Sequence, residues 1–220
     1  MNPINLESIG QYLMTNSTNI SGFEVTYSFM DHLIKFTRES DQKVDLISLV
    51  LNNDQNPSLN IGAGIALKNL NAIRSDIFQT QQNGINIWST NYFNLTGQSI
   101  DHLNSSSLKI SDEGSFDNFL IVFDNYLMQQ ALPFFNHINN EKDLIPLIEN
   151  ISIRKLGQLF TGSGILDKAI IYKLSNHPDA FTFIDNLETK YKTKMIENPT
   201  ESAYKEHLEL IQKARKFLEM

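Results

Sequence analysis

Along three segments in the first third of the chain, apolar residues alternate with polar or small ones, which predicts strands. A fourth segment, 44–51, is nearly all apolar and lies between turn residues, which suits a central strand covered on both faces. Successive side chains of a strand point to opposite faces, so a half-buried strand is apolar at every second position. Turn-forming residues separate the segments, most clearly at Asn52–Ser58, where two Asn, an Asp and a Pro occur together. The predicted strands are 23–29, 34–37, 44–51 and 59–67. Short turns between them predict an antiparallel meander, preceded by an amphipathic helix over residues 6–15.

From Ser111 onward the apolar positions follow the helical period of 3.6 residues instead. The first long helix of this part carries Phe116 and Phe123 on its apolar face and should end or kink at Pro133. Other segments with helical spacing are 69–81, 141–150, 153–160, 165–174, 184–195 and 201–220. The pattern also predicts a strand over residues 85–88 and a short edge strand over 108–110. An aromatic patch occupies residues 92–95.

These patterns predict an α+β protein. An N-terminal helix and an antiparallel meander pack against helices, and an all-helical C-terminal half follows. The composition changes near Ser111, so we expect a sheet region over 1–111 and a helical region over 112–220. No Gly- or Ser-rich linker separates them, which leaves open whether they form one continuous domain.

The segment Leu59–Leu67 is the most unusual of the predicted strands. Its odd positions are apolar, whereas its even positions, Asn60, Gly62, Gly64 and Ala66, are small. One face of this strand is therefore almost bare backbone, which allows something to approach closely. We expect one of the protein's own helices to be that neighbour, and a bound ligand is the alternative.

Few other residues are candidates for a site. Asp31 and His32, with Arg38 nearby, combine an acid, a base and a cation, although charged residues in a turn are normally just solvated. Trp88 belongs to an aromatic group that either anchors a partner or closes the core. The candidate binding residues are Asp31, His32, Asn60, Gly62, Gly64 and Trp88.

Known chemical motifs fail on inspection. Gly62-Ala63-Gly64 lacks the third glycine and the following helix that a dinucleotide-binding motif requires. The glycines of Gly157–Gly164 have phosphate-loop spacing, but Ser163 stands where the loop requires a lysine. The chain has no cysteine, and its five histidines are scattered. We therefore predict no cofactor, no metal ligand and no catalytic residue, which favours a protein that is not an enzyme.

The chain carries a formal net charge of −7, and this charge is uneven. Residues 1–150 contain 7 basic and 16 acidic side chains, whereas residues 151–220 contain 11 basic and 9 acidic side chains. Net acidity argues against nucleic acid and anionic membranes as partners. The chain also lacks a long apolar run and a secretory signal, so we expect a cytoplasmic protein. The acidic first part either attracts a basic protein or keeps the chain soluble.

The order of these features resembles a family of uncharacterised bacterial α+β domains, often encoded near polymorphic-toxin immunity genes. The matching stretches are Gly22-Phe23, Ile34–Arg38, Val44–Asn52, Leu59–Leu67, Phe116–Phe135 and Asp143-Leu144. The resemblance covers residues 6–148 and transfers no catalytic residue. It implies a small acidic protein that binds another protein, such as a toxin.

Three hypotheses follow from the sequence. The first is a non-enzymatic, immunity-like factor that binds a basic protein. The second is a small-ligand binder or enzyme with its site against the Asn60/Gly62/Gly64 strand face. The third is an interaction scaffold built on the C-terminal helices.

Overall fold

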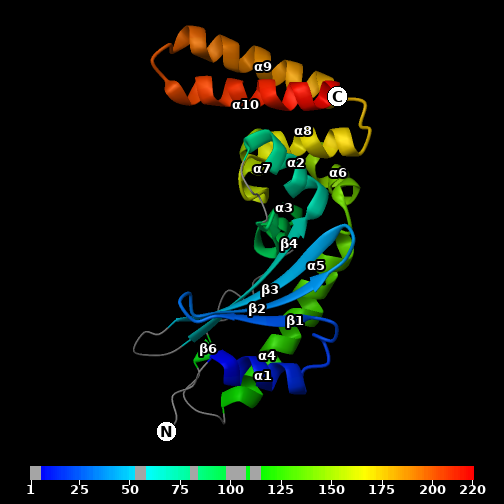
Figure 1. Cartoon of the computed structure of the whole chain (residues 1–220), viewed down its shortest axis with the longest axis vertical. Coiled ribbons are helices and arrows are strands. Elements are labelled where there is room, and N and C mark those ends of the chain that lie inside the picture. Colours follow the sequence, from blue (N-terminus) through cyan, green and yellow to red (C-terminus); the bar gives the residue numbers. More distant parts are fainter. Residues whose placement is uncertain (1–5, 53–57, 80–83, 98–107, 110–114) are drawn as a thin grey trace. The chain divides into compact units, whose positions relative to one another are not determined.

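The computed structural model describes residues 6–52, 58–79, 84–97, 108–109 and 115–220. Packing divides the chain into two compact units. The first, here called the sheet unit, comprises Met1–Ala66 and Ile85–Asn139. The second, the helical unit, comprises Leu67–Gly84 and Asn140–Met220. The described part is an α+β protein with a helical C-terminal half, as the patterning predicts (Figure 1).

The sheet unit is built on an antiparallel sheet. Its strands are β1 (Glu24–Ser28), β2 (Leu33–Glu39), β3 (Lys43–Asn52), β4 (Ser58–Leu67), β5 (Ile87–Trp88) and β6 (Leu108–Lys109). The order β1-β2-β3-β4-β5 is the expected meander continued by one strand, and β6 pairs with β4. The register between β2 and β3 places Phe36 opposite Ile47 and Ile34 opposite Leu49. These four side chains are fully buried and belong to the hydrophobic core of the unit.

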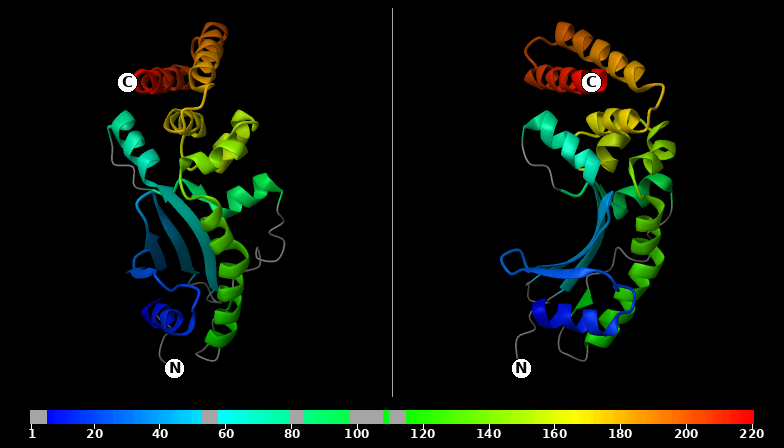
Figure 2. Two further views of the ribbon diagram at one scale, coloured as in Figure 1. Left: turned by 90° about the vertical axis from the view of Figure 1, so that its right-hand side faces the viewer. Right: turned by 45° about the vertical axis from the view of Figure 1, so that its right-hand side comes forward.

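Helices of the same unit cover one face of this sheet (Figure 2). They are α1 (Leu6–Asn16), α3 (Ser89–Thr96), α4 (Ser115–Tyr126) and α5 (Leu132–His137). Aromatic rings fill the space between the sheet and the helices. The ring centroids of Phe123 in α4 and Phe36 in β2 are 5.8 Å apart, and the Phe119 ring stacks on that of Phe123. The aromatic patch predicted at residues 92–95 belongs to α3, where Phe93 contacts Phe134 of α5. The apolar face of the strands and the apolar face of the helices thus pack together in one layer.

A single π-helical turn, Leu127–Ala131, joins α4 to α5. The N–H of Leu132 donates to the carbonyl of Leu127, five residues back. Pro133 follows directly, and proline has no N–H and its ring clashes with the carbonyl four residues earlier. The wider turn accommodates that clash, and the helix continues to His137 instead of ending at Pro133.

The helical unit contains helices only among its described residues. They are α2 (Lys68–Phe78), a 3₁₀ turn at Glu141–Leu144, α6 (Ile145–Ile148), α7 (Ile153–Leu159), α8 (Gly164–Leu174), α9 (Ala180–Glu197) and α10 (Ser202–Glu219). Helix α8 is the centre, since Leu166, Ala169, Ile170 and Ile171 are all nearly inaccessible to solvent. Helices α9 and α10 form an antiparallel pair, visible in orange and red in Figure 1.

The boundary predicted at residue 111 lies outside the described residues. By packing, α4 and α5 belong with the sheet, and α2 belongs with the helices that follow residue 140. The physical reason is the apolar stripe of α4 and α5, whose phenylalanines pack on the sheet. No helix in the described ranges is both long and apolar enough to span a membrane.

Candidate functional site

The bare strip of β4 is occupied by side chains of the sheet unit itself. A Cβ added to Gly64 would lie 2.7 Å from Ile85 Cγ2 and 3.1 Å from the Trp88 ring. One added to Gly62 would lie 3.0 Å from Ser48 Oγ and 3.6 Å from Trp88. Trp88 reaches both glycines because β5 pairs with β4 and places it directly opposite Gly64. The close neighbour is thus a tryptophan on the next strand, where we had expected a helix.

Three of the candidate residues therefore meet, namely Gly62, Gly64 and Trp88. Asn60 lies on the same strand and is exposed. Asp31 and His32 lie in the turn between β1 and β2, and β3 separates β2 from β4. The structure thus distributes the candidates over two places.

The acid and base of the predicted group do not converge with Arg38. Asp31 accepts a 2.6 Å hydrogen bond from Ser28 Oγ, which closes the turn. His32 has a φ of 49°, and its carbonyl accepts from the Leu51 N–H at 2.8 Å. Arg38 instead lies at the far end of β2 and binds Asp45.

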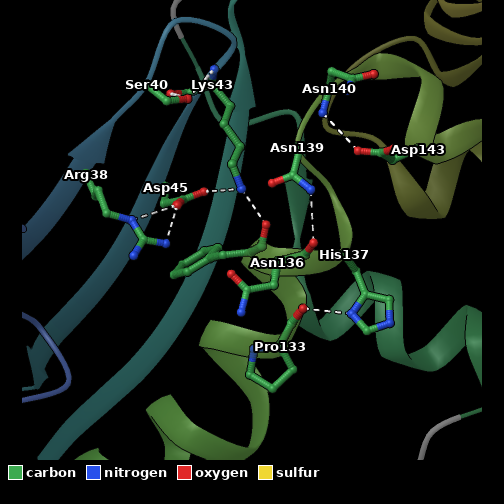
Figure 3. A network of polar contacts seen from close by, with 11 residues as sticks. Arg38, Ser40, Lys43, Asp45, Pro133, Asn136, His137, Asn139, Asn140 and Asp143 are labelled. Atoms are coloured by element: carbon green, nitrogen blue, oxygen red, sulfur yellow. Dashed lines mark hydrogen bonds and ion pairs between the residues drawn. The ribbon is translucent and has the colours of Figure 1, made fainter.

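A charged cluster in the sheet unit consists of the buried Lys43 and Asp45 and the partly exposed Arg38 (Figure 3). Asp45 is on β3 opposite Arg38, and its side chain is 3% exposed. One carboxylate oxygen accepts from Arg38 Nε at 3.1 Å and Nη2 at 2.7 Å, while the other pairs with Lys43 Nζ at 2.9 Å. The Arg38 guanidinium also lies 4.8 Å over the Phe23 ring. One buried carboxylate thus neutralises two cations, of which Lys43 is buried and Arg38 is partly exposed.

This cluster is connected to the C-terminal end of α5. Lys43 Nζ donates to the carbonyl of Phe135. Nearby, His137 Nδ1 donates to the Pro133 carbonyl at 2.9 Å, and Asn139 Nδ2 to the Asn136 carbonyl at 3.0 Å (Figure 3). The last carbonyls of a helix have no partner within the helix, and Lys43 and Asn139 supply one to Phe135 and Asn136. The cluster therefore fixes a helix end to the sheet, which is an architectural role.

A second buried pair, Arg74 of α2 and Asp167 of α8, lies in the helical unit. Arg74 Nε is 3.3 Å from Asp167 Oδ1, and Arg74 Nη2 donates to the Thr161 carbonyl at 2.7 Å. Neither carboxylate oxygen of Asp167 accepts a well-directed hydrogen bond. Burial raises the pKa of Asp167 to about 7, against the opposing effect of Arg74. Strongly shifted carboxyls occur both at functional sites and in structural pairs.

The space beside this pair depends on Gly162. Its φ is +115°, and an added Cβ would collide with Arg74 Nη2. Gly162 thus allows the Arg74 guanidinium to approach the backbone between α7 and α8. Sequence reasoning found the glycines of this segment but not their neighbour Arg74, because Arg74 lies 87 residues from its acceptor Thr161.

The described side chains offer no group of three or more His, Asp or Glu arranged as metal ligands. The comparisons with known proteins add no functional assignment. Family models, curated proteins and solved structures all gave no match to this chain.

Proposed function

We propose that the protein is a non-enzymatic factor whose sheet unit binds a basic protein partner, in the manner of an immunity factor. The observation that carries this proposal is the distribution of charge between the two units. The sheet unit contains 4 Lys and Arg against 12 Asp and Glu, a net charge of −8. The helical unit contains 14 Lys and Arg against 13 Asp and Glu, a net charge of +1. Acidity is thus a property of one unit.

Internal pairing strengthens this asymmetry. Two of the four cations of the sheet unit, Arg38 and Lys43, are paired with Asp45. Carboxylates such as Glu24 and Asp41 are exposed. A surface of one sign attracts an oppositely charged protein, accelerates its association and repels nucleic acid and anionic lipid.

Charge reversal tests the proposal with a matched control. The double variant Glu24→Lys with Asp41→Lys changes the sheet unit by four charges. The double variant Glu206→Lys with Glu209→Lys changes the total charge equally, at exposed positions of α10 in the helical unit. Tagged full-length protein of each kind is incubated with host extract at low salt, and retained proteins are quantified by mass spectrometry.

We expect wild type and the α10 variant to retain one basic protein in near-stoichiometric amount and the sheet-unit variant to lose it. Raising the salt concentration should release that protein, since screening weakens interactions between exposed charges. Equal loss in both variants, retention of an acidic protein, or retention of no stoichiometric partner contradicts the proposal. Circular dichroism confirms that each variant is folded.

A further inference from the structure

The turn between β1 and β2 holds two large apolar side chains in solvent. Phe29 is 63% exposed and Met30 is 94% exposed. Single exposed apolar residues are ordinary, but adjacent ones at a hairpin tip form a projecting apolar surface. Aromatic side chains at such positions are enriched among the residues that dominate binding energy.

The backbone of this turn is fixed by hydrogen bonds. The N–H of His32 donates to the Phe29 carbonyl at 3.4 Å, and the N–H of Leu51 donates to the His32 carbonyl at 2.8 Å. Ser28 Oγ donates to Asp31 at 2.6 Å. His32 adopts a left-handed φ of 49°, which residues with a Cβ rarely adopt. An ordered turn loses less conformational freedom when a partner binds it.

Two aromatic rings lie together at this tip. The rings of Tyr27 and Phe29 are stacked, with centroids 6.3 Å apart and planes inclined by 21°. Tyr27 is held against α1, because its hydroxyl occupies the space above Gly10. Asp31 supplies a carboxylate in the same turn, where it accepts a hydrogen bond from Ser28 Oγ.

We propose that this hairpin tip, formed by Tyr27, Phe29, Met30 and Asp31, is where an Arg- or Lys-bearing segment of the protein partner docks. Ring faces attract a cation, and the Asp31 carboxylate pairs with it. Phe29 and Met30 contact the apolar stem of the cationic side chain and its neighbours. This inference rests on the proposed function and adds to it the point of contact.

The charge of the sheet unit favours a protein over a membrane as the occupant. Exposed Phe and Met at a loop tip also suit insertion into lipid, but anionic lipid surfaces attract basic segments. Here the tip carries Asp31 and belongs to a unit with 4 basic and 12 acidic side chains. The same charges that repel an anionic bilayer attract a basic protein.

Methyl NMR of the full-length protein provides the test, because the chain has six methionines that can be labelled with ¹³C-methyl groups. The probe is a short peptide of alternating Arg and Leu, and a peptide of alternating Glu and Leu is its control. We expect the Arg peptide to shift the Met30 methyl resonance saturably and to leave that of Met220, which is 95% exposed, unchanged. Phe29→Ala should weaken binding at least tenfold, whereas Phe181→Ala, at an exposed phenylalanine of α9, should leave it unchanged.

Several results overturn the inference. They are equal shifts at Met30 and Met220, equal effects of the Arg and Glu peptides, equal effects of the two Phe→Ala variants, and binding to vesicles of anionic phospholipid that depends on Phe29. The charge-reversal experiment separates this inference from the proposed function. If Phe29→Ala retains the captured protein in full while charge reversal releases it, the proposed function stands and the hairpin tip is not its docking point.

Discussion

Lys43 on β3 donates to the carbonyl oxygen of Phe135 in α5, a residue 92 positions away in the sequence. The helical unit repeats this arrangement. Lys168 Nζ donates to the Ile148 carbonyl at 2.7 Å, at the end of α6. Lys173 Nζ donates to the Leu218 carbonyl at 2.5 Å, near the end of α10. In each case a cation lies at the negative end of a helix dipole, which adds electrostatic attraction to the hydrogen bond. Lysines that look like surface charges in the sequence thus hold separate elements together.

Asp45→Asn should destabilise the sheet unit. The substitution removes the negative charge that holds Arg38 and Lys43 together, and leaves Lys43 as a buried cation. We expect a loss of about 2–4 kcal/mol in the free energy of unfolding, below the largest values for buried pairs because Arg38 is partly exposed. Urea denaturation followed by Trp88 fluorescence measures the loss. Glu24→Gln is the control: it removes an exposed charge and should change stability by less than about 0.5 kcal/mol.

The two glycines of β4 should respond differently to alanine. At Gly64 an added methyl group meets Ile85 and Trp88 at 2.7 and 3.1 Å, so overpacking should cost about 1–3 kcal/mol. At Gly62 it meets Ser48 Oγ at 3.0 Å, and that hydroxyl can rotate away. The smaller entropy of unfolded alanine then offsets the contact, and the net change should stay within about 1 kcal/mol. Thermal unfolding compares the variants, and equal losses would contradict the packing described for Trp88.

The helical unit should become less stable as the pH rises toward 7, through Asp167. Its pKa in the folded protein is about 7, above the ordinary value of 3.8, so the folded state retains a proton that the unfolded state releases. The stabilising contribution of this group is complete at acidic pH and is lost as pH rises through the folded pKa. The free energy of unfolding should therefore fall more between pH 5 and pH 8 for wild type than for Asp167→Asn. Parallel pH profiles would refute this assignment.

Arg215 should contribute modestly to the pairing of α9 with α10. Its guanidinium bridges Asp185 and Glu188 of α9, with 2.6 Å between Nη2 and Glu188 Oε2. Because the group is partly exposed, Arg215→Ala should cost roughly 1 kcal/mol at low salt and less at 1 M salt. Lys216→Ala, an exposed neighbour on the same helix, is the control and should be neutral. Hydrogen exchange of α10 amides reports the loss locally, and a salt-independent loss would argue that Arg215 acts through packing.

Periodicity in the sequence was sufficient to predict most helices and strands of this protein. The apolar run 44–51 corresponds to β3, the alternation in 59–67 corresponds to β4, and the stripe of residues 184–195 falls within α9. These patterns depend on neighbours along the chain, which a sequence displays directly. Pro133 was predicted to end or kink the helix, and the structure places a π-helical turn directly before it, after which the helix continues to His137.

The contacts that matter for the candidate site depend on register and on distant pairing. Trp88 fills the strip beside Gly64 because β5 aligns there, and two residues of displacement would move it away. Asp45 faces Arg38 through strand register, and Asp167 meets Arg74 from a helix far along the chain. No local pattern encodes these pairs. The exposure of Phe29 and Met30 was likewise invisible, since the alternation of β1 suggested that Phe29 continues the strand's apolar face.

The division of the chain into interleaved units constrains how the protein can be made and cut. The backbone passes from one unit to the other three times, after Ala66, Gly84 and Asn139. During synthesis α2 emerges before α3, α4 and α5, which complete the helical cover of the sheet, and Arg74 can meet Asp167 only after α8 has been made. A single cleavage near residue 140 would therefore leave α2 attached to the wrong fragment, with its buried arginine uncovered. Separating the units cleanly would require a circular permutant or a replacement for residues 67–84, and no simple truncation would suffice.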